Sequence, residues 1–317
     1  MNKSVITITM NPAIDKSASV SQVIADRKLY CNSPRFEPGG GGINVSRVIR
    51  ILGGESTALF PCGGPSGAYL EKLLEQEGLS CHLIPVAGWT RENLVVLEES
   101  SGRQFRFGMP GTRLDDKEWR RCLDILAAVD HKPAYIVASG SLPPGVPDDF
   151  YARVARIGKD MGARVVIDTS GNPLQQALQE GVFLIKPNLR ELGELVGRDV
   201  ADDTSHQEIA MEMIKDGKSA VVVLSMGAGG VLLASANGCE RLRAPVVPIK
   251  SKVGAGDSLV AGTVLSLARG NELMDAVHFG IAAGAAAVMT PGSELCRLED
   301  VERLYALLNE EHKTNRS

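Results

Sequence analysis

The sequence has no long hydrophobic run and no strong excess of charge. No stretch reaches the ~18 consecutive apolar residues of a membrane-spanning helix. The N-terminal residues read as a strand and lack the apolar run and cleavage site of a signal peptide. The formal net charge of the 317 residues is −4, so no overall basic field attracts nucleic acid or an anionic membrane. We therefore expect a cytoplasmic protein with neither nucleic-acid nor membrane partners.

Metal-binding and disulfide patterns are also missing. The chain has six cysteines, but none forms a Cys-x-x-Cys pair, and none lies at zinc-site spacing from a histidine. This scatter predicts reduced thiols in a reducing compartment.

Short apolar runs alternate with helical patterns along most of the chain, which predicts an α/β fold with a mainly parallel central sheet. Strands are expected at 5–10, 134–138, 164–168, 182–186 and 220–224. Residues 17–36 and 92–108 break the alternation and read as extended, with a hairpin turn at 100–102. We expect these two segments to form a small antiparallel lid on a single domain that spans residues 1–317.

Glycine is over-represented, with 34 in the chain, and some of the glycines are bunched at 39–42, 227–230 and 254–256. The last group directly precedes a helical pattern, where backbone N–H groups and the helix dipole favour an anion. Asp257 at this helix start is either a helix cap or a general base. Four consecutive glycines at 39–42 are costly to order, which favours backbone contact with a small ligand. Asn44 would reach the same ligand.

Two further segments are ambiguous from the residues alone. Asn188 and Glu191 lie on one face of an expected helix, where they either cap it or hold a hard cation through water. The glycines of 225–230 lack G-x-G-x-x-G spacing and precede a strand, which argues against a nicotinamide-dependent oxidoreductase. Single polar residues beside strands or turns read individually as surface groups: Asp15, Lys28, Arg91 and Ser141.

Together these segments resemble the PfkB family of ribokinase-like sugar kinases over nearly the whole chain. The matching motifs are Asn11-Pro-Ala-Ile-Asp15, Pro38-Gly-Gly-Gly-Gly-Ile-Asn44-Val, Ser139-Gly-Ser141-Leu-Pro-Pro-Gly145, Lys186-Pro-Asn188-x-x-Glu191 and, most specifically, Val253-Gly-Ala-Gly-Asp257-Ser. Within the family, Trp89-Thr90-Arg91-x-Asn93 and Phe107-x-Met-Pro-Gly111 are similar to the type-2 ATP-dependent 6-phosphofructokinase branch. The resemblance implies a ribokinase-like three-layer α/β/α domain with a β lid. It also implies ATP and Mg²⁺ as cofactors, and phosphorylation of fructose 6-phosphate at its 1-hydroxyl.

The resemblance also assigns roles to residues. Asp257 would be the base, beside the phosphoryl-binding amides of Gly254, Ala255 and Gly256. The sugar would contact Asp15, Gly40, Gly41, Gly42, Asn44 and Ser141, and its distal phosphate would contact Lys28 and Arg91. The nucleotide site would comprise Lys186, Asn188, Ser225, Gly227, Gly230 and Val253. Asn188 and Glu191 would hold Mg²⁺ through water, and a potassium loop would comprise Ser251, Val253, Ala287 and Gly292.

The sequence departs from the branch at four positions: Ile24, Tyr30, Thr290 and Glu294. Ile24 replaces an aromatic residue at a second nucleotide site, which predicts weak inhibition by excess ATP.

Other activities stay open at this point. A tagatose-6-phosphate kinase or a 1-phosphofructokinase would use the same motifs. A non-catalytic sugar-phosphate sensor is less favoured, because binding alone needs no base at Asp257. The free edges of the lid predict that two lids pair in a homodimer, with apolar groups such as Leu94, Val96 and Phe105, or their alternating neighbours, on the lid's outer face.

Overall fold

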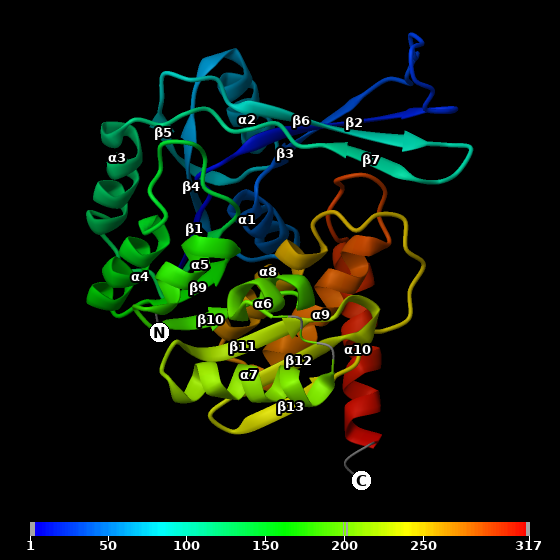
Figure 1. Cartoon of the computed structure of the whole chain (residues 1–317). Helices are drawn as coiled ribbons and strands as arrows, with labels where there is room; N and C mark the ends of the chain where they lie inside the picture. The colour runs from blue at the N-terminus through cyan, green and yellow to red at the C-terminus, as the bar shows by residue number, and fades with distance from the viewer. Residues whose placement is uncertain (1–3, 199, 201, 315–317) are drawn as a thin grey trace.

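A large, mainly parallel sheet forms the centre of the molecule. The computed structural model describes residues 4–198, 200 and 202–314. In these ranges the sheet has nine strands: β1 (Val5–Ile8), β4 (Thr57–Cys62), β5 (Ser80–Pro85), β8 (Tyr135–Ser139), β9 (Arg164–Asp168), β10 (Val182–Ile185), β11 (Ser219–Ser225), β12 (Val231–Ser235) and β13 (Gly238–Leu242). Their order is β13-β12-β11-β10-β9-β8-β1-β4-β5 (Figure 1). The strands from β11 to β5 are parallel, and β12 and β13 are antiparallel, so the mainly parallel prediction is confirmed.

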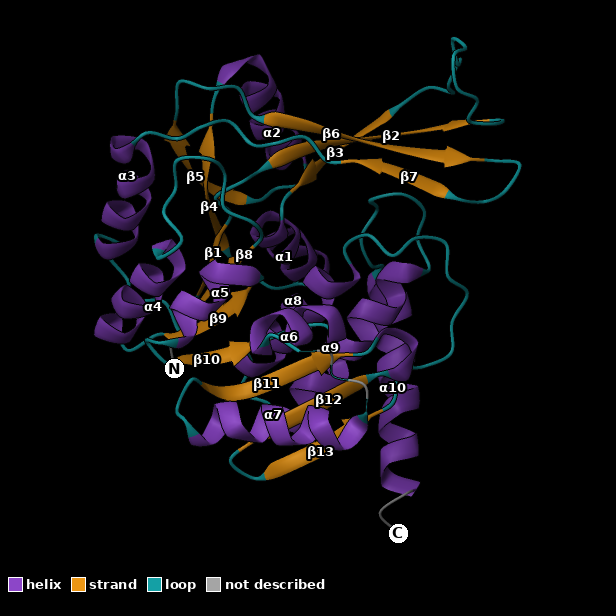
Figure 2. Ribbon diagram, in the orientation of Figure 1, coloured by secondary structure: helices purple, strands orange, loops and turns teal. Residues whose placement is uncertain are grey.

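Helices cover both faces of this sheet, which gives the predicted three layers (Figure 2). One face packs against α1 (Gly41–Ile51), α8 (Ala255–Ala268), α9 (Leu273–Val288) and α10 (Leu298–Thr314). The other packs against α3 (Asp116–Ala127), α4 (Phe150–Met161), α5 (Gly171–Leu178), α6 (Leu189–Val196) and α7 (Asp203–Lys215). Alternate residues of a strand are buried on opposite faces of the sheet. In β11, Val223 belongs to the core on the side of α8 and α9, and Val222 and Leu224 belong to the core on the side of α3 to α7. Strands buried on both faces explain the near-continuous apolar runs.

A second, small sheet contains four strands: β2 (Ala13–Val20), β3 (Arg35–Gly39), β6 (Arg91–Glu98) and β7 (Gln104–Phe107), in the order β3-β2-β6-β7. α2 (Gly64–Gln76) packs beneath its inner end. Figure 1 shows the small sheet projecting above α8 and α9. The predicted hairpin is present as β6 and β7.

Two details of the small sheet differ from the sequence prediction. The first strand begins at Ala13 instead of residue 17, and residues 21–34 form no strand. The β2–β3 and β6–β7 pairings are antiparallel as expected, but the central β2–β6 pairing is parallel. The reason is topological, because β2 and β6 both leave the main domain at their first residues and run outward side by side.

The two faces of the small sheet differ in character. Residues in register across neighbouring strands share a face. Asp15 lies opposite Glu37 and Asn93, which gives one polar face. Leu94 pairs with Phe107 and Val96 pairs with Phe105, and these four residues belong to the opposite face. The grouping of Leu94, Val96 and Phe105 on one face agrees with the prediction.

The strand order reverses at β1, because β4 and β5 extend to one side and β8 to β11 extend to the other. In open α/β sheets, ligands bind outside the carboxyl ends of the strands at such a switch point. In the described part of the chain, no helix is long and apolar enough to cross a membrane.

Candidate active site

A cavity of about 810 Å³ opens at the carboxyl ends of the central strands. Ser139 ends β8, Asp168 ends β9, and Lys186 follows β10, so three neighbouring strands deliver polar side chains to it. Seven residues predicted from the sequence line this cavity: Gly41, Ser141, Lys186, Glu191, Gly254, Gly256 and Asp257.

Glycines bring the backbone of α1 against the switch point. A Cβ at Gly42 would lie 2.5 Å from the carbonyl oxygen of Ile8, and a Cβ at Gly41 would overlap the hydroxyl of Ser139. Gly40 has φ 111°, a conformation that side chains rarely adopt. The close approach that the glycines allow is thus made to the protein's own residues, and the contact of this loop with a small ligand stays a prediction.

Asp257 lies in the first turn of α8, three residues after the left-handed Gly254 (φ 73°). Asn44 Nδ2 donates a hydrogen bond of 2.8 Å to Asp257 Oδ2. Burial and the nearby Asp168 carboxylate raise the pKa of Asp257 to about 6, against the opposing effects of Asn44 and Lys186. A carboxylate with this pKa is mostly ionised at neutral pH and still basic enough to accept a proton.

Lys186 and Asp168 form an ion pair of 3.2 Å, with exposed side-chain fractions of only 7% and 13%. Burial alone would lower the pKa of Lys186, but Asp168, Glu191 and Asp257 together raise it above its ordinary value. A Cβ at Gly256 would lie 3.2 Å from Lys186 Nζ. The absence of a side chain at Gly256 thus leaves the lysine ammonium facing the backbone at the start of α8.

A second group of polar residues lies at the base of the small sheet. Asn93 Nδ2 donates to Asp15 Oδ1 at 2.8 Å. Arg91 donates from Nη1 to Met109 O and from Nη2 to Asn11 O, both at 2.9 Å. Its buried Nε has no hydrogen-bond partner among the described residues. Burial lowers the pKa of the Arg91 guanidinium, and the Asp15 carboxylate opposes this shift.

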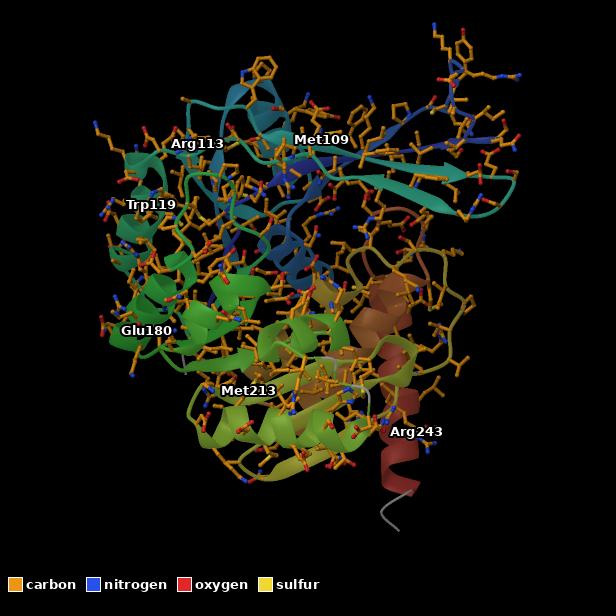
Figure 3. The ribbon with its side chains drawn as sticks, viewed as in Figure 1. Met109, Arg113, Trp119, Glu180, Met213 and Arg243 are labelled. Atoms are coloured by element: carbon orange, nitrogen blue, oxygen red, sulfur yellow. The ribbon has the colours of Figure 1, made fainter. Side chains whose placement is uncertain are left out.

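This group continues into the main domain. Asn11 Nδ2 donates to the Ser141 hydroxyl at 3.1 Å, and Ser141 lines the cavity. The negative charge of Asp15 also acts to raise the pKa values of both Asp257 and Arg91. Figure 3 labels Met109 at the inner part of the small sheet, above the main domain.

Asn188 and Glu191 form a complete capping box at the start of α6. Glu191 N donates to Asn188 Oδ1 at 2.9 Å, and Asn188 N donates to Glu191 Oε2 at 3.0 Å. Glu191 also lines the cavity, and the second oxygen of its carboxylate, Oε1, lies 4.0 Å from Nη2 of the exposed Arg190. An isolated bridge joins Asn188 to Ser225, whose hydroxyl donates to Pro187 O at 3.3 Å. Gly227 and Gly230 follow in the turn between β11 and β12, a strand–loop–strand arrangement as predicted.

The residues of the expected potassium loop lie together beside α9. Ser251 Oγ donates to Gly292 O at 2.6 Å, and Val253 N donates to Ser251 Oγ at 3.2 Å. Thr290 Oγ1 donates to Ala287 O at 2.7 Å. Next to Gly292, the Ser293 hydroxyl donates to Glu37 of the small sheet at 2.5 Å, which joins this loop to β3.

Lys28 is the predicted residue that the structure leaves apart from the others. Ala13 pairs with Arg91 at one end of β2 and Val20 pairs with Glu98 at the other, a separation of roughly 23 Å for eight residues. Lys28 is exposed on the loop that follows Val20, with Nζ 5.1 Å from the centre of the Tyr30 ring. Lys28 and Arg91 therefore do not meet within one subunit.

Sequence reasoning missed two polar residues of this region. Asp168 ends a strand that was predicted, so the preference of ligands for the carboxyl ends of parallel strands was an available signal. Asn93 belongs to a motif that the sequence analysis named, but it was given no role, because its contact with Asp15 depends on strand register.

The arrangement has the parts that phosphoryl transfer needs. A buried carboxylate lies at a helix N-terminus, among glycine amides and opposite a lysine. Positioning and charge stabilisation supply most of the catalysis in this reaction class.

Comparisons with known proteins agree with this chemistry. A curated relative, the ATP-dependent 6-phosphofructokinase isozyme 2 of Mycobacterium tuberculosis, is 44% identical over 306 residues, 96% of this chain and 90% of that protein. The structure of phosphofructokinase-2 from Escherichia coli in complex with potassium matches with a TM-score of 0.93 and 39% identity, covering 98% of this chain and 100% of that one. The same Escherichia coli enzyme in complex with fructose-6-phosphate matches with a TM-score of 0.92, 38% identity and the same coverage. The model of the pfkB family of carbohydrate kinases matches residues 3–300, and the chain belongs to that family.

Proposed function

We propose that the protein is an ATP-dependent 6-phosphofructokinase, which phosphorylates the 1-hydroxyl of fructose 6-phosphate. The observation that carries the proposal is Asp257, a buried carboxylate at the N-terminus of α8 that faces both Lys186 and Asn44. The similarity to relatives named for this activity supports the choice of substrate.

In the proposed mechanism, Asp257 accepts the proton of the 1-hydroxyl as its oxygen attacks the γ-phosphorus of ATP. The new oxygen–phosphorus bond forms while the bond to the β,γ-bridging oxygen breaks, and ADP leaves with that electron pair. Amides of residues 254–256 and the Lys186 ammonium stabilise the charge on the phosphoryl group. Asn44 holds Asp257 by its hydrogen bond, so the base is oriented before the substrate arrives.

The sugar is held between the base and the small sheet. Asp15 accepts hydrogen bonds from sugar hydroxyls, and Gly40–Gly42 and Ser141 contact the sugar from the main domain. Arg91 binds the 6-phosphate. Its buried, unpartnered Nε is an observation of the chain itself that fits an anionic ligand.

ATP occupies the cavity toward Ser225, Gly227 and Gly230. The oxygen donors of Glu191, which lines the cavity, and of Asn188, which caps the same helix, fit Mg²⁺ held through water. When bound with ATP, the metal ion neutralises phosphate charge. Potassium would be held by the loop of Ser251, Val253, Ala287 and Gly292, because carbonyl oxygens are suitable ligands and those of Gly292 and Ala287 already accept hydrogen bonds from Ser251 and Thr290.

The small sheet acts as a lid on a single kinase domain and as the contact surface of a homodimer. Its free strand edges and its apolar face, on which Leu94 and Phe105 are partly exposed and Phe107 is 48% exposed, support pairing of two lids. In such a dimer, Lys28 would reach the site of the neighbouring subunit instead of its own. The six free thiols support a cytoplasmic location.

The test is a coupled ATP-consumption assay with fructose 6-phosphate, fructose 1-phosphate, tagatose 6-phosphate and free fructose. The highest kcat/KM is expected with fructose 6-phosphate. A higher value with tagatose 6-phosphate or fructose 1-phosphate would identify a related sugar-phosphate kinase. Binding of sugar phosphate without ATP consumption would identify a sensor.

A further inference from the structure

Asn93 holds the Asp15 carboxylate through a contact fixed by strand register. Asp15 and Asn93 lie directly opposite each other in the parallel pair of β2 and β6, so their side chains share a face. Asn93 Nδ2 donates to Asp15 Oδ1 at 2.8 Å. On the other side, a Cβ at Gly39 would lie 2.5 Å from Asp15 Oδ2. The carboxylate is thus confined between the Asn93 amide and the bare backbone of Gly39.

The other end of the same amide holds a second segment. Met109 N donates to Asn93 Oδ1 at 3.1 Å, while Arg91 Nη1 donates to Met109 O at 2.9 Å. Two residues of β6, Asn93 and Arg91, therefore bind the backbone N–H and the backbone carbonyl of Met109. Arg91 continues to Asn11 O, and Asn11 continues to Ser141 at the cavity. One chain of hydrogen bonds thus runs from Asp15 to the cavity, and in it the Asn93 side chain uses both its donor and its acceptor.

We propose that Asn93 is a positioning residue of the sugar site, which orients Asp15 with its amide nitrogen and the Met109 segment with its amide oxygen. The inference rests on the proposed function, because it assigns Asp15 and Arg91 to the sugar phosphate. Only an amide of this length supplies both contacts. A leucine supplies neither, and a carboxylate supplies no donor and adds a second negative charge beside Asp15.

The first test is steady-state kinetics of Asn93→Ala with each substrate varied in turn. KM for the sugar phosphate should rise about 10- to 100-fold, as for loss of hydrogen bonds to charged groups, while KM for ATP stays within about twofold. Asn237→Ala is the matched control, because it removes an exposed amide from the turn between β12 and β13. An unchanged KM for the sugar phosphate, or equal rises in both KM values, would overturn the inference.

The second test is the pH dependence of Asn93→Asp, which keeps the side-chain size and also serves if Asn93→Ala does not fold. The charged groups that face Asp15 are Glu37 on β3, Arg91 on β6 and Asp257 across the cleft. Two adjacent carboxylates share a proton at lower pH, and the shared proton restores a donor toward Asp15. The kcat/KM of the variant relative to wild type should therefore rise as pH falls from about 8 to about 6. A ratio that does not change with pH would overturn the inference.

The outcome is separable from that of the proposed function. If wild type prefers another sugar phosphate from the assay panel, the proposed function is wrong, and both tests are made with the preferred sugar. The expected rise in KM for that sugar would still support the role of Asn93.

Discussion

Asn44 Nδ2 and Asp257 Oδ2 lie 2.8 Å apart, although 213 positions separate the two residues in the sequence. Each residue is in the first turns of a helix that follows a glycine run, Asn44 in α1 and Asp257 in α8. The contact joins the proposed sugar-binding helix to the proposed catalytic helix. It also orients the carboxylate and opposes its protonation, because the amide donates to the charged form.

Replacement of Asp257 by asparagine tests its role as the base. Asp257→Asn keeps the size of the side chain but cannot accept the hydroxyl proton, so kcat should fall at least about 10²-fold. KM values for both substrates should change little, because binding does not depend on proton transfer. Asp203→Asn is the control, because Asp203 also lies in the first turn of a helix, α7, but is exposed. A kcat near that of wild type would remove Asp257 from the mechanism.

The pH profile of wild type tests the environment of the same carboxylate. Burial raises the pKa of Asp257 to about 6, and the active base is the ionised form. Below this pKa, kcat/KM should fall about tenfold per pH unit, and above it kcat/KM should level off. Asn44→Leu removes the donor that lowers the pKa, so its acidic limb should move to higher pH. An acidic limb near pH 4 in wild type would contradict the burial argument.

The buried ion pair predicts a large stability effect. Lys186→Met leaves Asp168 without its cation in a site where both side chains are almost fully covered, so the free energy of unfolding should fall by about 3 kcal/mol. Lys218→Met is the matched control, because its partner Asp216 and the lysine are each about half exposed. The control should cost less than about 1 kcal/mol. Urea denaturation measures both, and equal losses would argue against a special role of burial.

The sequence-based predictions succeeded where local pattern determines structure. The apolar runs gave the parallel sheet, and the glycines before Asp257 gave a helix start that faces a cavity. The small antiparallel sheet is confirmed in its β2–β3 and β6–β7 pairings, but the parallel pairing of β6 with β2 was not predicted, because it depends on where both strands leave the main domain. Asp168 was missed although its place at the end of a predicted strand was an available signal, whereas Asn93 was missed because its partner Asp15 lies on another strand. A pattern along the sequence does not determine which residues of two distant strands lie opposite each other.

The apolar face of the lid predicts a homodimer, and a single charged substitution on this face should dissociate it. Phe107 is 48% exposed on the apolar face of the small sheet, beside Leu94. Phe107→Glu would bury a charge in the proposed interface and should convert the dimer to a monomer at micromolar concentration. Leu307→Glu is the control, because Leu307 is similarly exposed, at 46%, but lies on α10. Sedimentation velocity decides, and a wild-type monomer with full activity would refute lid pairing.

Complementation between subunits tests whether Lys28 acts on the neighbouring site. Arg91 lies at the base of the small sheet and Lys28 lies beyond its far end, so one subunit cannot place both on one phosphate. Homodimers of Lys28→Ala and of Arg91→Ala should both have a raised KM for fructose 6-phosphate, by about 10- to 100-fold. In the mixed dimer, the site of the Lys28→Ala subunit keeps its own Arg91 and receives Lys28 from the neighbour, so half of the sites should regain the wild-type KM. If Lys28 acted within its own subunit, every site of the mixed dimer would lack one cation, and no low-KM fraction would appear.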